Sequence, residues 1–162
     1  MSDGSATESI DLSFVEPSTG DSFCLTHEPL DVDKIMNSVR DNGAGALVTF
    51  VGTTRDNFNG KPVVRLEYEA YSKLAVKTMV KIARDSRALE IPPHDFGPTS
   101  SIPTTTAGQI TRIAIHHRLG SAPVGESSIV IAVKMKTPIW KREWYAGGEV
   151  ANEAVWKANF PP

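Results

Sequence analysis

Cysteine is almost absent from this sequence, since Cys24 is the only one among 162 residues. A single cysteine excludes an internal disulfide framework and a zinc site made of several cysteines. The chain also lacks an apolar run long enough to span a membrane. Residues 1–8 have no hydrophobic centre and no arginine, so we expect neither a secretory signal nor a transit peptide there. These absences predict a cytosolic protein in a reducing compartment.

An excess of charge of one sign is absent as well. The 17 lysines and arginines against 19 aspartates and glutamates give a net charge of −2. A protein with this balance has no global positive field for nucleic acid, so any anion site must be local. The sequence contains no Gly-rich phosphate loop and no order of Ser, His and Asp typical of a serine hydrolase. A hydrophobic content of 40% is enough for the core of one domain.

The pattern of apolar residues predicts an α+β fold with a mixed or largely antiparallel sheet. Residues 1–22 are rich in Ser, Thr, Gly and Asp, and we interpret them as a disordered tail before a single domain at 23–162. The near-continuous apolar run 44–51 predicts a central strand buried on both faces. Alternating residues predict four further strands, at 23–27, 64–70, 110–117 and 127–135.

Capping residues and apolar stripes predict two helices. Asp31 or Asp33 is expected to begin the first, which ends at Asn42-Gly43. Ser72 is expected to cap the second, with an apolar stripe formed by Leu74, Ala75, Met79, Ile82, Ala83 and Leu89. Asn59-Gly60 predicts a tight hairpin turn. Residues 118–125 predict another turn, and the four prolines in 91–108 predict a long exposed loop.

A basic cluster near the C-terminal end is the strongest candidate for chemistry. Lys134 and Lys136 precede the segment 137–143, in which Lys141 and Arg142 follow a proline and a tryptophan. Such a cluster suits an anionic small molecule or an acyl transfer. The alternative, which composition alone favours, is a solvated basic strand end followed by a core tryptophan.

Thr53, Thr54 and Arg55 follow the apolar run directly, and the end of a strand is a common place to present a ligand group. Arg55 offers a planar fork for a phosphate or a carboxylate. The alternative is a surface ion pair of Arg55 with Asp56.

The adjacent histidines 116 and 117 point to opposite faces of a strand and are unsuited to sharing one metal ion. With no ligand set at the right spacing, we predict no metal site and no cofactor. His117 with Arg118 could hold an anion, and a structural histidine at a turn is an equal alternative. We interpret Cys24 as buried or incidental.

Four segments taken in order give the chain a family resemblance: GALVTFVGTTR at 45–55, LEYEAY at 66–71, HRLG at 117–120 and PIWKRE at 138–143. Together they resemble the catalytic (large) subunit of molybdopterin synthase. The resemblance implies an α/β hammerhead fold with an added antiparallel subdomain. It also implies conversion of precursor Z, a cyclic pyranopterin monophosphate, to molybdopterin in molybdenum cofactor biosynthesis. The sulfur would come from the C-terminal glycine thiocarboxylate of a small ubiquitin-like subunit. A homodimer of large subunits would form the centre of a heterotetramer.

The resemblance also implies roles for individual residues. Lys134 and Lys141 match catalytic positions, and the substrate-binding positions are Thr53, Thr54, Arg55, Lys134, Lys141, Arg142 and Glu143. Arg55 and Lys141 would balance the substrate phosphate. Lys134 would stabilise negative charge that develops on oxygen and pass a proton.

The sequence departs from the family pattern in two places. The loop 91–108 is longer than usual. After Val133, members of the family continue with a His-Arg pair and a long amphipathic helix, whereas here Val133 joins Lys134 directly. The absence of about five helical turns predicts an exposed part of the sheet and a displaced Lys134. The alternative function is therefore a non-catalytic variant that binds the ubiquitin-like small subunit without turnover.

Overall fold

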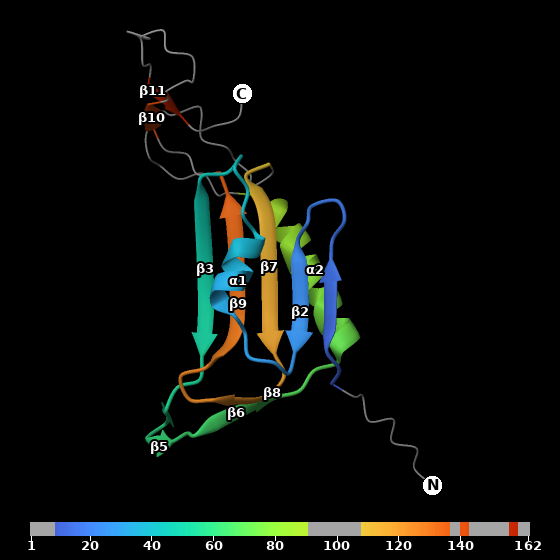
Figure 1. Ribbon diagram of the computed structural model, residues 1–162, viewed down its shortest axis with the longest axis vertical. Coiled ribbons are helices and arrows are strands. Elements are labelled where there is room, and N and C mark those ends of the chain that lie inside the picture. The colour runs from blue at the N-terminus through green and yellow to red at the C-terminus, as the bar shows by residue number, and fades with distance from the viewer. Residues whose placement is uncertain (1–8, 91–107, 137–139, 143–155, 159–162) are drawn as a thin grey trace.

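The computed structural model describes residues 9–90, 108–136, 140–142 and 156–158. Its centre is a five-stranded sheet in the order β1-β2-β7-β9-β3 (Figure 1). The strands are β1 Leu12–Val15, β2 Ser22–Thr26, β3 Ala46–Thr53, β7 Ile110–Arg118 and β9 Ser127–Met135. The β2–β7 pair is parallel and the other three pairs are antiparallel. The predicted α+β class with a mixed sheet is confirmed.

Two helices cover opposite faces of this sheet. α1, Val32–Ser38, packs Ile35 and Val39 on small side chains of β7 and β9. α2, Ser72–Arg87, packs Val76 and Ala83 on the other face. The Asp31 carboxylate caps α1 by accepting a hydrogen bond of 2.9 Å from the Lys34 N–H, as the sequence predicts. None of the helices in this part of the chain is long and apolar enough to cross a membrane.

The start of α2 differs from the prediction. Its N-cap residue is Tyr71, and no side chain caps the helix. The Ser72 hydroxyl instead accepts from the Ile10 N–H at 3.0 Å and donates to the Ile10 carbonyl at 2.8 Å. A long-range partner has therefore replaced the local cap that the sequence suggested.

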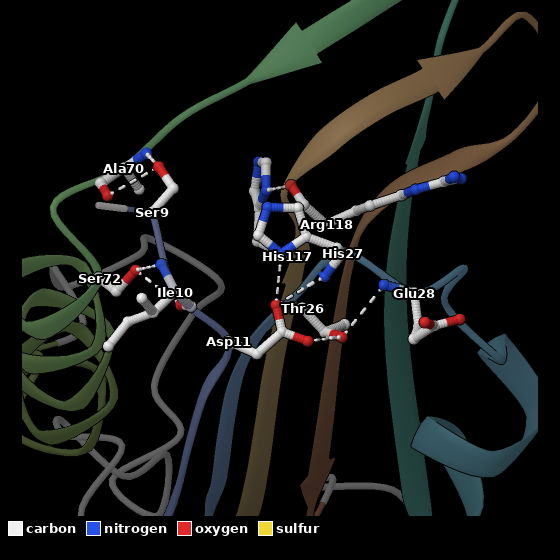
Figure 2. Close-up of polar contacts among 10 residues, drawn as sticks. All are labelled: Ser9, Ile10, Asp11, Thr26, His27, Glu28, Ala70, Ser72, His117 and Arg118. Atoms are coloured by element: carbon white, nitrogen blue, oxygen red, sulfur yellow. Dashed lines mark hydrogen bonds and ion pairs between the residues drawn. The ribbon is translucent and has the colours of Figure 1, made fainter. Parts of the chain in front are cut away.

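Residues 9–21 are structured and include β1, in contrast to the predicted tail over 1–22. β1 pairs antiparallel with β2, from Leu12 opposite Leu25 to Val15 opposite Ser22. Figure 2 shows how the residues before β1 are held: Ser9 exchanges two hydrogen bonds with the Ala70 backbone, and Ile10 is bonded to Ser72. Because this segment is polar in composition, its sequence did not reveal a four-residue strand that forms a hairpin with β2.

Within the described ranges, three small two-stranded sheets lie outside the main one. They pair β4 Asn57–Phe58 with β5 Lys61–Pro62, β6 Arg65–Tyr68 with β8 Gly120–Pro123, and β10 Trp140–Arg142 with β11 Trp156–Ala158. The Asn59-Gly60 turn is confirmed, with positive φ at both residues (49° and 75°) as a type I′ turn requires. β8 lies within residues 118–125, which were predicted to form a turn. Since Gly120 and Pro123 are typical of turns, the sequence pattern did not indicate that this segment pairs with β6.

β3 is an edge strand, so the prediction of a central strand buried on both faces is wrong. It pairs with β9 alone, and Val48 and Phe50 are 56% and 58% exposed. Val48 and Phe50 lie opposite Val133 and Ile131, which pack on the α2 side of the sheet. α2 covers β1, β2 and β7 on that side, covers β9 only in part, and leaves the β3 side chains Val48 and Phe50 exposed. The exposure predicted from the absent helix is therefore present.

Ala83 of the predicted apolar stripe of α2 is buried in the core, whereas other members of the stripe face this uncovered area. Leu74 and Ile82 are 63% and 52% exposed, and with Met79 they line an apolar groove of about 480 Å³ against Ile129 and Ile131. Residues 91–107, Pro138 and Glu143 lie outside the described residues.

Candidate functional site at the end of β3

A β-bulge re-aims the end of β3. Gly52 lies opposite Ile129, whereas Thr53 lies opposite Ser127. A Cβ added at Gly52 would lie 2.6 Å from the Ile129 side chain, so a larger residue at this position would force that side chain to move. Bulges often occur next to binding sites because they change the direction of the side chains that follow. Here those side chains are Thr53, Thr54 and Arg55.

Thr54 is the fixed point of this strand end. It is 2% exposed, and its hydroxyl donates to the Ala122 carbonyl at 3.1 Å. Its N–H donates to the Glu126 carbonyl at 3.2 Å, and its own carbonyl accepts from the Gly125 N–H at 2.9 Å. The turn after β8 thus holds the backbone that precedes Arg55.

Arg118 and Glu126 brace the same turn from within. The Arg118 Nη1 donates to the Glu126 carboxylate, and the Arg118 side chain is 11% exposed. The Arg118 Nε is buried without a hydrogen-bond partner within the described structure. One charged contact therefore balances a nearly buried guanidinium close to the Thr54 backbone.

Arg55 is exposed and free to bind an anion. It has no ion pair among residues 9–90 and 108–136. The alternative pairing with Asp56 is absent, since the Asp56 carboxylate accepts from the Asn57 side chain at 2.6 Å. A guanidinium on a firmly held backbone can bind a phosphate through two parallel hydrogen bonds. This end of the sheet is the candidate anion site.

The two adjacent histidines have separate environments. His116 is hydrogen-bonded to the Ser22 hydroxyl at 3.1 Å, and burial lowers its pKa from the ordinary 6.5, which favours the neutral ring. The His117 Nδ1 donates to the Arg118 carbonyl at 2.6 Å, and its ring meets the Tyr68 ring edge-on at 4.9 Å. Within the described residues no cluster of three or more potential ligands could hold a metal ion.

His117 and Arg118 do not form a joint anion site. Figure 2 shows their side chains extending in different directions, and the Arg118 guanidinium is bonded to Glu126. Cys24 is half-buried, and burial raises the pKa of its thiol, which makes it a poor nucleophile at neutral pH.

Lys134 lies at the opposite end of the sheet. It is half-buried in β9, beside Leu47 at the start of β3 and Arg112 of β7. Asp41 is close by: a backbone hydrogen bond from Gly43, with smaller contributions from Arg112 and Lys134, lowers the pKa of its carboxyl. Lys134 therefore belongs to a surface group of opposite charges.

One chain does not bring Lys134 and Arg55 together. Leu47, the neighbour of Lys134, and Thr53 are six residues apart on β3, which corresponds to roughly 20 Å along an extended strand. Lys141 and Arg142 lie in β10, paired with β11, while Glu143 is outside the described residues. Of the predicted set, Thr53, Thr54 and Arg55 form one group and Lys134 stands apart.

Sequence reasoning missed the residues that hold the group in place. Ala122, Glu126 and Arg118 act through long-range contacts, for which no spacing rule exists. The one local signal was Gly125, whose φ of +84° marks a tight turn that favours glycine. A glycine of this kind indicates that the chain turns, but it does not indicate which distant residues the turn contacts.

Comparisons with known proteins place these observations in a family. Residues 25–137 match the family model described as MoaE protein. The chain is 41% identical to molybdopterin synthase catalytic subunit 1 of Aedes aegypti, over 83% of this chain and 87% of that protein. It is 39% identical to the molybdopterin synthase catalytic subunit of Pyricularia oryzae, over 83% of this chain and 72% of that protein.

Solved structures show the same fold at low identity. Molybdopterin synthase from Staphylococcus aureus gives a TM-score of 0.53 at 23% identity, over 68% of each chain. The molybdopterin biosynthesis MoaE protein from Burkholderia ambifaria gives a TM-score of 0.51 at 20% identity, over 83% of this chain and 87% of that one. The arrangement of the mixed sheet and its helices is therefore one that known proteins share.

Proposed function

This chain belongs to the MoaE protein family of molybdopterin synthase catalytic subunits, and we propose that it converts precursor Z to molybdopterin with sulfur from a small thiocarboxylated subunit. Its role is in molybdenum cofactor biosynthesis. In detail, we propose precursor Z as the substrate and the glycine thiocarboxylate of the small subunit as the sulfur donor. We also propose a cytosolic heterotetramer with two large subunits at its centre. The observation that carries it is Arg55 on the braced end of β3, exposed and without an ion pair to any residue that the structure describes.

Arg55 is the group proposed to bind the cyclic phosphate of the substrate. Thr54 holds the backbone before it through three hydrogen bonds, and Thr53 is exposed beside it. A site that is rigid before the substrate arrives loses little entropy on binding. We assign Lys141, Arg142 and Glu143 to the same phosphate-binding set because the segment PIWKRE at 138–143 resembles the family, although it lies beyond the family-model match at 25–137.

Lys134 is the group proposed to act on the reacting atoms. Sulfur attack and opening of the tricyclic substrate build negative charge on oxygen, which an ammonium group stabilises and can neutralise with a proton. For this role Lys134 has to lie within a few ångströms of a substrate bound at Arg55. Since one chain separates them by roughly 20 Å of β3, we propose that a second large subunit supplies the lysine.

The alternative function, a non-catalytic variant that binds the small subunit, is favoured by one observation. The alignment with the Aedes aegypti subunit extends over 154 residues but takes in only 83% of this 162-residue chain. At about 20 aligned positions that protein therefore has a residue where this chain has a gap. Twenty residues are enough for a helix of about 30 Å. We propose that this is the helix missing after Val133, which in relatives would return the lysine toward the arginine.

A reconstituted turnover assay separates the two functions. The chain is combined with a thiocarboxylated small subunit and precursor Z, and molybdopterin is measured. The catalytic proposal predicts product, at least a tenfold loss of kcat/KM in Arg55→Ala, which corresponds to about 1.4 kcal/mol, and no turnover in Lys134→Ala. Arg65→Ala, on the exposed face of β6, is the matched control and should retain full activity.

Binding without product defines the variant function. If the small subunit binds tightly by calorimetry and no molybdopterin forms, the catalytic proposal fails and the alternative stands. If Lys134→Ala turns over at the wild-type rate, the assignment of Lys134 is wrong even though the enzyme is active.

A further inference from the structure

An open groove of about 620 Å³ lies at the edge of the sheet that is remote from β3, between β1 and α2. Leu12 and Phe14 of β1 and Val76 and Val80 of α2 form its apolar floor. Figure 1 shows α2 reaching this outer edge of the sheet, where no further strand covers it. The groove contains none of the residues proposed for the reaction, so a role for it does not depend on the proposed function.

Cations line the helix side of the groove. Lys73, Lys77, Lys81 and Arg84 follow one another along α2 at helical spacing. Lys81 pairs with Asp85, and Arg84 pairs with Glu16 at 2.8 Å. Lys73 and Lys77 have no ion pair within the part of the chain that the structure describes, and both are exposed. The half of the groove beside Leu12 is thus positively charged and uncompensated.

The strand side of the groove is an unprotected edge. β1 has the sequence Leu-Ser-Phe-Val, with no charge and no proline, and Phe14 and Val15 are 38% and 59% exposed. Its only sheet neighbour is β2, so one side of its backbone has no strand partner in the described structure. Soluble proteins usually block such an edge with lysine, proline or a bulge, and an open one is a template for another strand.

We propose that this groove binds an extended acidic segment of a partner protein, which adds to the free edge of β1 as an antiparallel strand. Backbone hydrogen bonds to β1 would supply affinity, and side chains facing α2 would supply selectivity. Lys73 and Lys77 are separated by about 6 Å of helix rise, and alternate residues of a strand are separated by about 6.6 Å. Two carboxylates two residues apart therefore match the two lysines, with an apolar side chain over Val80.

A model peptide tests this directly. The probe is a fluorescein-labelled heptapeptide, Thr-Val-Thr-Glu-Thr-Glu-Thr, titrated with the full chain by fluorescence anisotropy. We expect saturable binding in the millimolar range or tighter, and chemical-shift changes in the amides of residues 12–15. The double variant Lys73→Glu with Lys77→Glu should weaken binding by at least about tenfold, since two attractions become repulsions. The same peptide with lysine in place of both glutamates should not bind.

The matched control is Lys34→Glu with Lys61→Glu, which makes the same charge change at exposed positions in α1 and β5. This variant should bind the probe like the wild type. Three results would overturn the proposal: no saturable binding, equal binding by both double variants, or shifts that spare residues 12–15. Self-association of the chain through β1 that excludes the probe would also overturn it. So would binding of phosphatidylglycerol vesicles through Lys73 and Lys77 without binding of the peptide.

Discussion

Arg118 and Glu126 form a charged contact between a nearly buried guanidinium and a half-exposed carboxylate, 11% and 47% exposed. The contact lies beside the backbone of Thr54 and thus connects the interior with the strand end that carries Arg55. Because the two partners differ in burial, the cost of losing each one is unequal. A hydrated carboxylate tolerates the loss of its partner better than a buried cation does.

This asymmetry gives the first prediction. Glu126→Ala leaves the Arg118 charge buried and uncompensated, and we expect it to lower the free energy of unfolding by about 3 kcal/mol. Arg118→Met removes the buried charge together with its unpaired Nε, and should cost less, about 1 kcal/mol. Urea unfolding of both variants measures the difference. Equal costs would show that the contact is a surface ion pair.

The separation of Arg55 from Lys134 gives the second prediction. If each site takes its arginine from one large subunit and its lysine from the other, Arg55→Ala homodimers have at least tenfold lower kcat/KM and Lys134→Ala homodimers do not turn over. Co-assembly of equal amounts should then restore about a quarter of wild-type activity, because half the dimers contain one intact site out of two. The measurement is molybdopterin formation after the two variants are unfolded and refolded together.

No recovery in that mixture would place Arg55 and Lys134 in the same site of the same chain. A double variant carrying both substitutions, mixed with wild type, controls for the effect of refolding. In the mixed dimers each site lacks either Arg55 or Lys134, so only the dimers made of two wild-type subunits turn over.

Local patterns predicted the strands and turns whose signals are contained in a few residues. β9 has the predicted bounds, and the Asn59-Gly60 turn has the predicted geometry. β3 was wrongly predicted to be a central strand because a continuous apolar run has the same sequence pattern whether its own chain or another surface covers it. β1 was not predicted because it is four residues long and lies in a polar segment, and β8, also four residues long, pairs with the distant β6.

The candidate site divides in the same way. Arg55 was found because it directly follows a recognisable strand. Its supports, Thr54 with Ala122 and Arg118 with Glu126, depend on how the β6–β8 pair folds back onto the strand end. The position of Lys134 depends on topology: β9 runs antiparallel to β3, so its last residues lie at the opposite end from Arg55. Comparison of motifs along the sequence does not show in which direction each strand runs within the sheet.

The uncovered part of the sheet gives the third prediction. If the roughly 20 residues that the Aedes aegypti subunit has in addition form the proposed helix, inserting them between Val133 and Lys134 should cover Val48, Phe50 and Ile131. Burial of these side chains should raise the free energy of unfolding by about 2 kcal/mol or more and reduce binding of a hydrophobic dye. Thermal melts and dye fluorescence measure both effects. An insertion that leaves dye binding unchanged would show that the segment packs elsewhere.

A buried ion pair on the α2 side gives the fourth prediction. Asp21 is 2% exposed and accepts two hydrogen bonds of 2.7 Å from Arg87 and one of 2.8 Å from the Ile113 N–H. Asp21→Ala leaves a guanidinium and a backbone N–H unpaired, and should lower the free energy of unfolding by about 3–5 kcal/mol. Arg84→Ala, whose arginine is 70% exposed, is the control and should cost less than about 1 kcal/mol. Chemical denaturation of both variants provides the comparison.

The fifth prediction concerns His116. Burial lowers its pKa in the folded protein below the ordinary 6.5, so between these two values the unfolded chain binds more protons than the folded one. Stability therefore rises with pH across that window and falls as the pH drops below 6.5. His116→Gln, which retains a polar group for the Ser22 hydroxyl, removes this titration and should flatten the dependence. Free energies of unfolding at pH 7.5 and 5.5 measure it, and an unchanged slope in the variant would assign the dependence to another group.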